Sequence, residues 1–320
     1  IIEMEKIKKL RKLLIDENIS GYIVPKNDEF FGEYTPYHND RLDYISNFSG
    51  SYGFALILKN RNYLFVDGRY TIQANDQSGK VFKIITLPNQ IPYDLLKSHN
   101  LQIGYDPKLF TTKMLNRFFV GWNAKLIPLK KNLIDKIWKR EIQRNKGKFY
   151  KLPDQSGSRT LNSKLNKVVN NLKKNNADFQ FITASENSAW LFNIRGSDSK
   201  YSPIPYCYIL IDKKGKINFF CDLSKISKKM RRVFNKINFL KIEKTSHILS
   251  QIKKKKFIID KDTCSSYFES IILKNNLILE CNDLIYELKA IKTHQEIKNI
   301  QRAHIYDGAA LTKYLFWIKI

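Results

Sequence analysis

Long apolar runs and a secretion signal are both missing from this sequence. No apolar stretch approaches the roughly 18–20 residues that are needed to cross a bilayer. The first twenty residues interleave apolar with charged side chains, and they contain neither a continuous apolar core nor a small-residue cleavage site. These absences argue against membrane-spanning and secreted classes, and we expect a cytoplasmic protein.

Cysteine and histidine are also scarce. The cysteines lie far apart in the second half of the chain, and none belongs to a C-x-x-C pair; they are Cys207, Cys221, Cys264 and Cys281. The histidines form no cluster with them at the spacing of a zinc site. We therefore expect buried, reduced thiols and no metal ion bound by this chain.

Acidic residues are few beside the basic ones, since 30 Asp and Glu stand against 56 Lys and Arg and give a formal net charge of +26. Such an excess can attract nucleic acid. Here it is mostly lysine spread along the whole chain, whereas nucleic-acid sites are clustered and richer in arginine and aromatic residues. The densest run, KKKK at 253–256, is interpreted as a solvated helix end. Specific nucleic-acid binding is not expected.

Core-forming residues are abundant. With 43% hydrophobic and 13% aromatic residues, the 320-residue chain has material for two domains of about 150 residues each. Helix and strand patterns alternate in the first half, where Gly21 is interpreted as the stop signal of the first helix. Helices are predicted at 4–17, 69–78 and 112–122, and strands at 21–25, 54–58, 63–66, 81–86, 101–106 and 124–129, with 54–66 as a hairpin.

A polar stretch at about 140–160 is predicted to be a linker. The order of elements then repeats, with helices at 161–174 and 185–193 and strands at 179–184, 206–211, 216–221, 239–242 and 257–260. The pattern predicts an α/β protein with two tandem domains of related fold, each a mixed β-sheet flanked by helices. We place the first domain at 1–150, the second at 151–285 and a third element at 286–320.

The last segment has the pattern of an amphipathic helix over 294–318. Thr293 and Glu296 have the spacing of a capping box. The apolar stripe of such a helix normally packs inside a domain, and it consists of Ile297, Ile300, His304, Leu311, Leu315 and Ile318. His304 and Asp307 could both face a metal ion, but two ligands make no site, and a packed histidine is the preferred interpretation.

The stretch FVDGRYTIQA (65–74) places an arginine at a strand-to-helix corner. A strand ends at Asp67, Gly68 permits a sharp turn, and Arg69 opens a helix. The guanidinium could reach across a domain boundary to a carboxylate or peptide carbonyl, because its fork binds two oxygens at once. Alternatively, Asp67 and Arg69 form a pair that only closes the corner. Spacing alone favours the pair.

Two segments are punctuated by glycine. FSGSYG (48–53) is not followed by a helix, so it is no phosphate-binding loop, and a tight turn accounts for its glycines. NIRGSDSKYSPIP (193–205) is predicted to be an ordered loop that bridges the two domains.

Four stretches taken together are more specific than any one alone. They occur in the order GEYTPYHNDRLDYISNFSGSYGFALI, FVDGRYTIQA, ENSAWLFNIRGSDSKYSPIPYCYILI and AIKTHQEIKNIQRAHIYDGAALTKYLFW. Together they closely resemble the long, three-domain form of Xaa-Pro aminopeptidase (aminopeptidase P), over nearly the whole chain. The resemblance implies two creatinase-type N-terminal domains before a pita-bread catalytic domain. In that family the catalytic domain binds two divalent metal ions, usually manganese, and removes an N-terminal residue that precedes proline.

The resemblance also implies that the helix at 294–318 is the first helix of the catalytic domain. The family's metal ligands and catalytic histidines all follow that helix, so the chain is expected to be a truncated module that is inactive alone. One role carries over: the arginine of the DGRY motif contacts substrate, and it is Arg69 here. The substrate of the complete enzyme is a peptide with proline at its second position.

Other interpretations stay open. The chain could be one subunit of a split enzyme that a separate catalytic chain completes, or a non-enzymatic module that binds peptides or nucleic acid. A homodimer also stays open, since dimers of the family rely largely on the catalytic domain.

Three positions depart from the family pattern. Tyr52 stands where the family has a small residue in G-S-A-G, and Asn47 replaces a usual glycine. Asn187 occupies a position that is usually acidic, before the A-W pair. A bulky tyrosine in a tight turn is tolerated if its side chain points outward. These changes put in doubt whether the surface that faces the active site is preserved.

Overall fold

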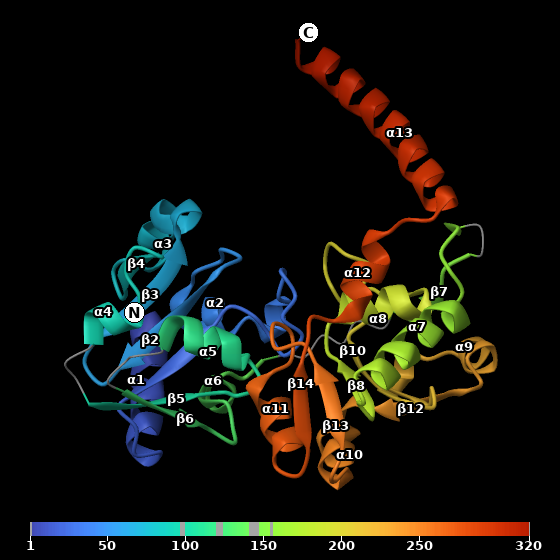
Figure 1. The fold of residues 1–320 in the computed structure, drawn as a ribbon. Helices are drawn as coiled ribbons and strands as arrows, with labels where there is room; N and C mark the ends of the chain where they lie inside the picture. The colour runs from blue at the N-terminus through green and yellow to red at the C-terminus, as the bar shows by residue number, and fades with distance from the viewer. Residues whose placement is uncertain (1, 97–99, 120–123, 141–146, 154–155, 320) are drawn as a thin grey trace.

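Two six-stranded mixed sheets form the centre of the molecule, as seen in a computed structural model (Figure 1). The structure describes residues 2–96, 100–119, 124–140, 147–153 and 156–319. The sheets lie in two neighbouring bodies, and the last helix, α13 (His294–Lys319), projects away from both (Figure 1). Within the described residues, no helix is both long enough and apolar enough to span a membrane.

The first sheet has the strand order β4-β3-β2-β1-β5-β6. The pairs β1–β2 and β2–β3 are antiparallel, and the other neighbours are parallel. The strands are β1 (Gly21–Pro25), β2 (Gly53–Leu58), β3 (Asn62–Asp67), β4 (Lys83–Leu87), β5 (Leu101–Tyr105) and β6 (Ala124–Pro128). The predicted hairpin at 54–66 is confirmed by the β2–β3 pairing.

Helices cover both faces of this sheet because successive side chains of its strands point to opposite sides. Val24 packs in one core cluster with the apolar face of the first helix, whereas Ile23 packs in another with the residues of Thr112–Phe119. The helices are α1 (Ile2–Asp16), α2 (Arg41–Ser46), α3 (Thr71–Ser78), α4 (Pro92–Leu96), α5 (Thr112–Phe119) and α6 (Leu133–Ile137).

Gly21 does not end α1, contrary to the interpretation from sequence. Asn18, with a φ of 51°, takes the left-handed conformation after the helix. Gly21 begins β1, where a Cβ atom would lie 2.6 Å from the side chain of Leu58 and 2.8 Å from the carbonyl oxygen of Ile57. The glycine is therefore needed for the close approach of β2.

The second sheet repeats the first, with the order β12-β11-β10-β8-β13-β14. As in the first sheet, two neighbouring pairs are antiparallel, here β10–β11 and β8–β10, and the other three are parallel. Its strands are β8 (Phe179–Ile182), β10 (Cys207–Asp212), β11 (Ile217–Cys221), β12 (Ile237–Lys241), β13 (Lys256–Ile259) and β14 (Leu277–Glu280). The prediction of two domains of related fold is confirmed strand by strand.

Six helices surround this second sheet in the described residues: α7 (Leu161–Lys174), α8 (Ser185–Phe192), α9 (Lys228–Val233), α10 (Thr245–Gln251), α11 (Ser266–Leu273) and α12 (Leu284–Ala290). Part of the predicted linker belongs to this body, because β7 (Tyr150–Lys151) pairs with β9 (Ile194–Arg195). Residues 141–146 and 154–155 of that linker lie outside the described residues.

An aromatic stack joins the two bodies. The ring of Phe30 lies 4.2 Å from that of Tyr206 and 5.3 Å from that of Tyr208, measured between centroids. The ring of Tyr201 packs edge-on against Tyr34 at 4.8 Å. The prediction that residues 193–205 form an ordered bridging loop is therefore confirmed. Farther along the junction, Lys113 on α5 forms an ion pair with Asp262 of the second body.

The predicted capping box opens α13. The backbone N–H of Thr293 donates to Glu296 Oε2 at 2.7 Å, and the backbone N–H of Glu296 donates to Thr293 Oγ1 at 3.1 Å. The apolar stripe of the helix is exposed, and none of the described side chains of α13 is buried. His304 is exposed, so its interpretation as a packed histidine is wrong.

Candidate functional site

The corner that carries Arg69 is built by Asp67. β3 ends at Asp67, whose carboxylate accepts the backbone N–H of Arg69 at 2.9 Å and caps the short 3-10 turn Gly68–Tyr70 before α3. Gly68 is not what permits the turn. Its φ is not positive, and an added Cβ atom would meet nothing within 4 Å.

The predicted pair between Asp67 and Arg69 is present. Nη2 of Arg69 lies 2.7 Å from Asp67 Oδ2, and Nε lies 3.2 Å from each carboxylate oxygen. The side-chain hydrogen bond from Arg69 lowers the pKa of Asp67, which therefore stays ionised. The Arg69 side chain is still 72% exposed. Among the described residues nothing accepts a hydrogen bond from its Nη1, so the guanidinium is oriented and has donors to spare.

The second body forms the same corner without an arginine. β11 ends one residue before Asp222, whose carboxylate accepts the backbone N–H of Ser224 at 2.9 Å and caps the 3-10 turn Leu223–Lys225. Ser224 thus occupies the position that Arg69 has in the first body. Since an aspartate alone suffices to build this corner, the arginine is not required for it, and its exposed fork is available for a ligand.

A cavity of about 340 Å³ lies beside Arg69. Its rim is formed by exposed side chains of both bodies, namely Glu33, Tyr52, Arg69 and Asp262. Of these charges, Asp262 is already paired with Lys113 at 2.7 Å. The site therefore presents one oriented cation beside a pocket at the domain junction. This arrangement suits a ligand that has a polar backbone and an apolar side chain.

The glycine-punctuated segment 48–53 forms one wall of this cavity and is a turn, as predicted. It is tied to the Arg69 corner because the hydroxyls of Ser51 and Tyr70 are 2.7 Å apart, and Gln77 accepts the backbone N–H of Ser49. Asn47, the replacement for a glycine, has a φ of 59° and ends α2 in the left-handed conformation. Asparagine tolerates that conformation better than most residues, so the replacement leaves the turn intact.

Asn187 has a structural role. It is fully buried, its amide donates to Asp283 at 2.8 Å, and its carbonyl oxygen accepts from Lys289 at 2.6 Å. Burial raises the pKa of Asp283 to about 6. An acidic side chain at position 187 would place a second carboxylate against this one, so the asparagine is matched to its neighbour.

Neither thiols nor metal ligands form a catalytic group in the described part of the chain. Burial raises the pKa of Cys221 to about 12 and also raises the pKa of Cys207, which disfavours the nucleophilic thiolate. Cys264 is also buried and reduced, as expected, whereas Cys281 is half-buried. No group of three or more His, Cys, Asp or Glu side chains could hold a metal ion there. The described residues therefore do not fit a metal centre.

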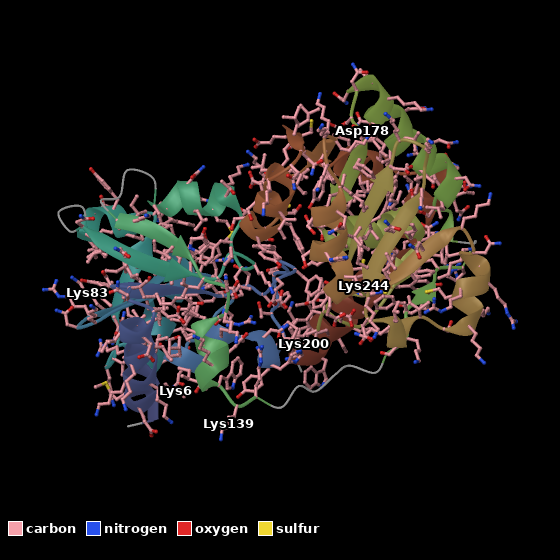
Figure 2. All side chains as sticks on the ribbon, turned by 90° about the horizontal axis from the view of Figure 1, so that it is seen from below. Lys6, Lys83, Lys139, Asp178, Lys200 and Lys244 are labelled. Carbon is pink, nitrogen blue, oxygen red and sulfur yellow. The ribbon has the colours of Figure 1, made fainter. Side chains whose placement is uncertain are left out.

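The positive charge does not single out one site. Figure 2 shows labelled lysines on both bodies, with Lys6, Lys83 and Lys139 on the first and Lys200 and Lys244 on the second. A larger cavity, of about 830 Å³, lies along the Asp222 corner and contains none of the residues that sequence reasoning singled out as functional.

Comparisons with known proteins agree on both halves of the chain. A model of the creatinase/prolidase N-terminal domain matches residues 6–137, and a second model of that name matches residues 140–296. Xaa-Pro aminopeptidase 1 of Dictyostelium discoideum is 29% identical over 341 residues, which cover 98% of this chain and 53% of the relative. The Drosophila melanogaster Xaa-Pro aminopeptidase ApepP is 29% identical, with 94% and 51% covered.

A crystal structure of an X-prolyl aminopeptidase from Caenorhabditis elegans, described as a cytosolic enzyme with a di-nuclear active site, superimposes with a TM-score of 0.90. It is 25% identical, and the match covers all of this chain and 56% of that one. The chain thus spans about half the length of the relatives it matches.

Proposed function

Because this chain consists of two creatinase/prolidase N-terminal domains and is homologous to Xaa-Pro aminopeptidases along nearly its whole length, we propose that it is the N-terminal module of such an enzyme. The complete enzyme is a metal-dependent, cytoplasmic aminopeptidase that releases an N-terminal residue preceding proline. The observation that carries the proposal is the TM-score of 0.90 over the whole chain. In this proposal the module comprises domains 1–150 and 151–285, and residues 286–320 open the catalytic part.

Arg69 is proposed to hold the peptide substrate. Its guanidinium is fixed by Asp67 yet exposed, and its unused N–H groups can donate to a carbonyl oxygen of an extended peptide. Such positioning lowers the barrier by restricting the peptide before the reaction. The metal ligands belong to the catalytic part, where two divalent ions, manganese in most of the family, would supply Lewis acidity for hydrolysis.

The exposed apolar side chains of α13 support a large partner surface. Along the helix, residues such as Ile305, Leu311, Leu315 and Trp317 are more than half exposed, and apolar surface of this extent marks an interaction site. We assign it to the catalytic part, which accounts for the other half of the relatives. A separate catalytic chain that covers the same helix is the alternative.

Peptidase assays test the proposal. With manganese present, the 320-residue chain alone should release nothing from a peptide with proline at its second position. Release should appear when the chain is continuous with, or mixed with, a catalytic part that carries the metal ligands, and a chelator should abolish it. Chelator-sensitive release by the chain alone would contradict the proposed division of labour, and co-purification of a separate metal-binding chain would favour the split enzyme.

A further inference from the structure

We propose that the cavity beside Arg69 is a subsite for an apolar side chain of the peptide, and that Tyr52 limits the size of the side chain it admits. This inference rests on the proposed function, which supplies the peptide. It concerns a residue at which the chain departs from its family.

The cavity has an apolar floor beneath a polar rim. The floor consists of side chains that are buried or half-buried, namely Phe54, Phe110, Met114 and Phe118. Of the polar side chains in the lining, Lys26, Asn27 and Thr35 are not exposed, and each is hydrogen-bonded within the protein. A volume of about 340 Å³ is at the small end of ligand sites, so it suits one side chain and its adjoining backbone better than a nucleotide or cofactor.

The charges around the cavity favour a ligand with an uncharged side chain on a polar backbone. Lys26 is paired with the buried Asp40, and Asp262 is paired with Lys113. Arg69 and Glu33 lie at the rim with opposite signs, and Arg69, although paired with Asp67 through Nε and Nη2, keeps further N–H donors. An extended peptide offers both partners that such a rim needs, because it carries carbonyl oxygens for the arginine and amide N–H groups for the carboxylate.

Tyr52 is fixed at the edge of the same cavity. The residue after it, Gly53, has a φ of 154°, and a Cβ atom there would lie 2.6 Å from the carbonyl oxygen of Phe65, so the backbone cannot shift towards β3. On the other side, Ser51 is hydrogen-bonded to Tyr70. Tyr52 is 39% exposed and belongs to the residues that line the cavity. A small residue here would leave that space open for a larger side chain of the peptide.

The methionines allow a direct measurement. The chain has three, and only Met114 lies in the cavity floor, since Met4 is on α1 and Met230 is in the core of the second domain. The chain is labelled with methyl-¹³C methionine and titrated with the peptide amides Ala-Pro-Ala, Ala-Pro-Leu and Ala-Pro-Phe. The Met114 signal is identified from a Met114→Leu variant, and its shift gives each dissociation constant.

The wild-type chain should bind Ala-Pro-Ala about tenfold more tightly than Ala-Pro-Phe, which is a typical discrimination for a pocket that selects by side-chain size. In Tyr52→Ala this order of affinities should be reversed. Tyr52→Phe keeps the wall and should keep the wild-type order. Tyr93→Ala is the matched control, since Tyr93 is 38% exposed and lies outside the cavity on α4. Arg69→Ala should weaken the binding of all three peptides by the same factor.

An unchanged order in Tyr52→Ala, or a Met114 signal that never moves, would overturn the subsite. The two proposals can fail separately. If the complete enzyme releases residues before proline while the Met114 signal stays still, the subsite is wrong and the proposed function stands. If the order reverses but no residue before proline is ever released, the subsite stands and the proposed function is wrong.

Discussion

The two domains share one sheet topology but use it differently. In each domain, the sheet strand that comes third along the chain (β3 or β11) is followed by a 3-10 turn that an aspartate caps. In the first domain the turn presents the exposed Arg69 beside a cavity. In the second domain Ser224 takes that position, and the next residue, Lys225, is buried in an ion pair with Asp198. The comparison separates what the fold requires, the aspartate, from what it leaves free, the arginine.

The second domain uses its buried polar groups for a junction instead. Lys164 on α7 is fully buried, and its ammonium donates to Ser158 Oγ, the carbonyl oxygen of Trp190 and Asn193 Oδ1, at 2.5–3.0 Å. The segment it anchors meets α13, because Thr293 donates to the carbonyl oxygen of Gly157 at 2.9 Å. The second domain therefore sets where α13 begins, whereas the first presents the arginine.

The largest expected effect is on the pH dependence of the free energy of unfolding, and it concerns Lys164 at that junction. Burial lowers the pKa of Lys164 from 10.5 to about 8. The folded protein thus releases this proton at a lower pH than the unfolded chain, so Lys164 should contribute a rise of about 3 kcal/mol to the free energy of unfolding between pH 8 and pH 10.5. The buried thiols, whose pKa is raised, contribute in the opposite direction, so the contribution of Lys164 is read from the difference between variants. Lys164→Met should lack this rise in urea denaturation, while exposed Lys167→Met should retain it. Equal pH profiles for the two variants would contradict the account.

A second comparison concerns two asparagines that follow helices, Asn176 after α7 and Asn193 after α8. Both are left-handed, with φ values of 48° and 52°. Asn176 is exposed, whereas the Asn193 side chain bonds to Ser158, Lys164 and the backbone of Arg159. Asn193→Gly should therefore lower the free energy of unfolding by about 2 kcal/mol, whereas Asn176→Gly should change it by less than about 1 kcal/mol. Similar losses would show that the network at Asn193 adds no stability.

The smallest effects should fall on the two corners. Asp67→Ala and Asp222→Ala each remove a cap and should each cost about 1 kcal/mol of unfolding free energy. Arg69→Ala removes an exposed ion pair and an exposed contact with the Tyr70 ring, and it should cost less than about 0.5 kcal/mol. Thermal unfolding of the three variants checks this order. A loss with Arg69→Ala as large as that with Asp67→Ala would mean that the arginine does serve the corner.

Elements with strong local signals were predictable from sequence. β1 and α7 have the predicted bounds, because the first is a short apolar run that ends in proline and the second begins after the capping Thr160. β14 and α11 were missed. β14 is an edge strand with half-exposed side chains, so its sequence carries little apolar pattern.

The site was predictable only in part. Asp67 and Arg69 are two residues apart, so their pairing follows from local geometry. The cavity brings Tyr52, Met114 and Asp262 together from distant parts of the chain, and no local sequence pattern predicts contacts between such distant residues. The roles of two glycines were predicted wrongly for the same reason, since they depend on distant neighbours. Gly21 is required by the close approach of a neighbouring strand, whereas nothing lies close to Gly68.

The measurement that tests the central claim most directly is the activity of the complete enzyme with Arg69 or Ser224 replaced by alanine. The rate constant kcat/KM for a peptide with proline at its second position is compared with the wild-type value. Arg69→Ala should lower it by about 10–100-fold, as expected for a charge-assisted hydrogen bond to substrate, and Ser224→Ala should leave it unchanged. Equal activities for the two variants, or a loss with Ser224→Ala alone, would contradict the account.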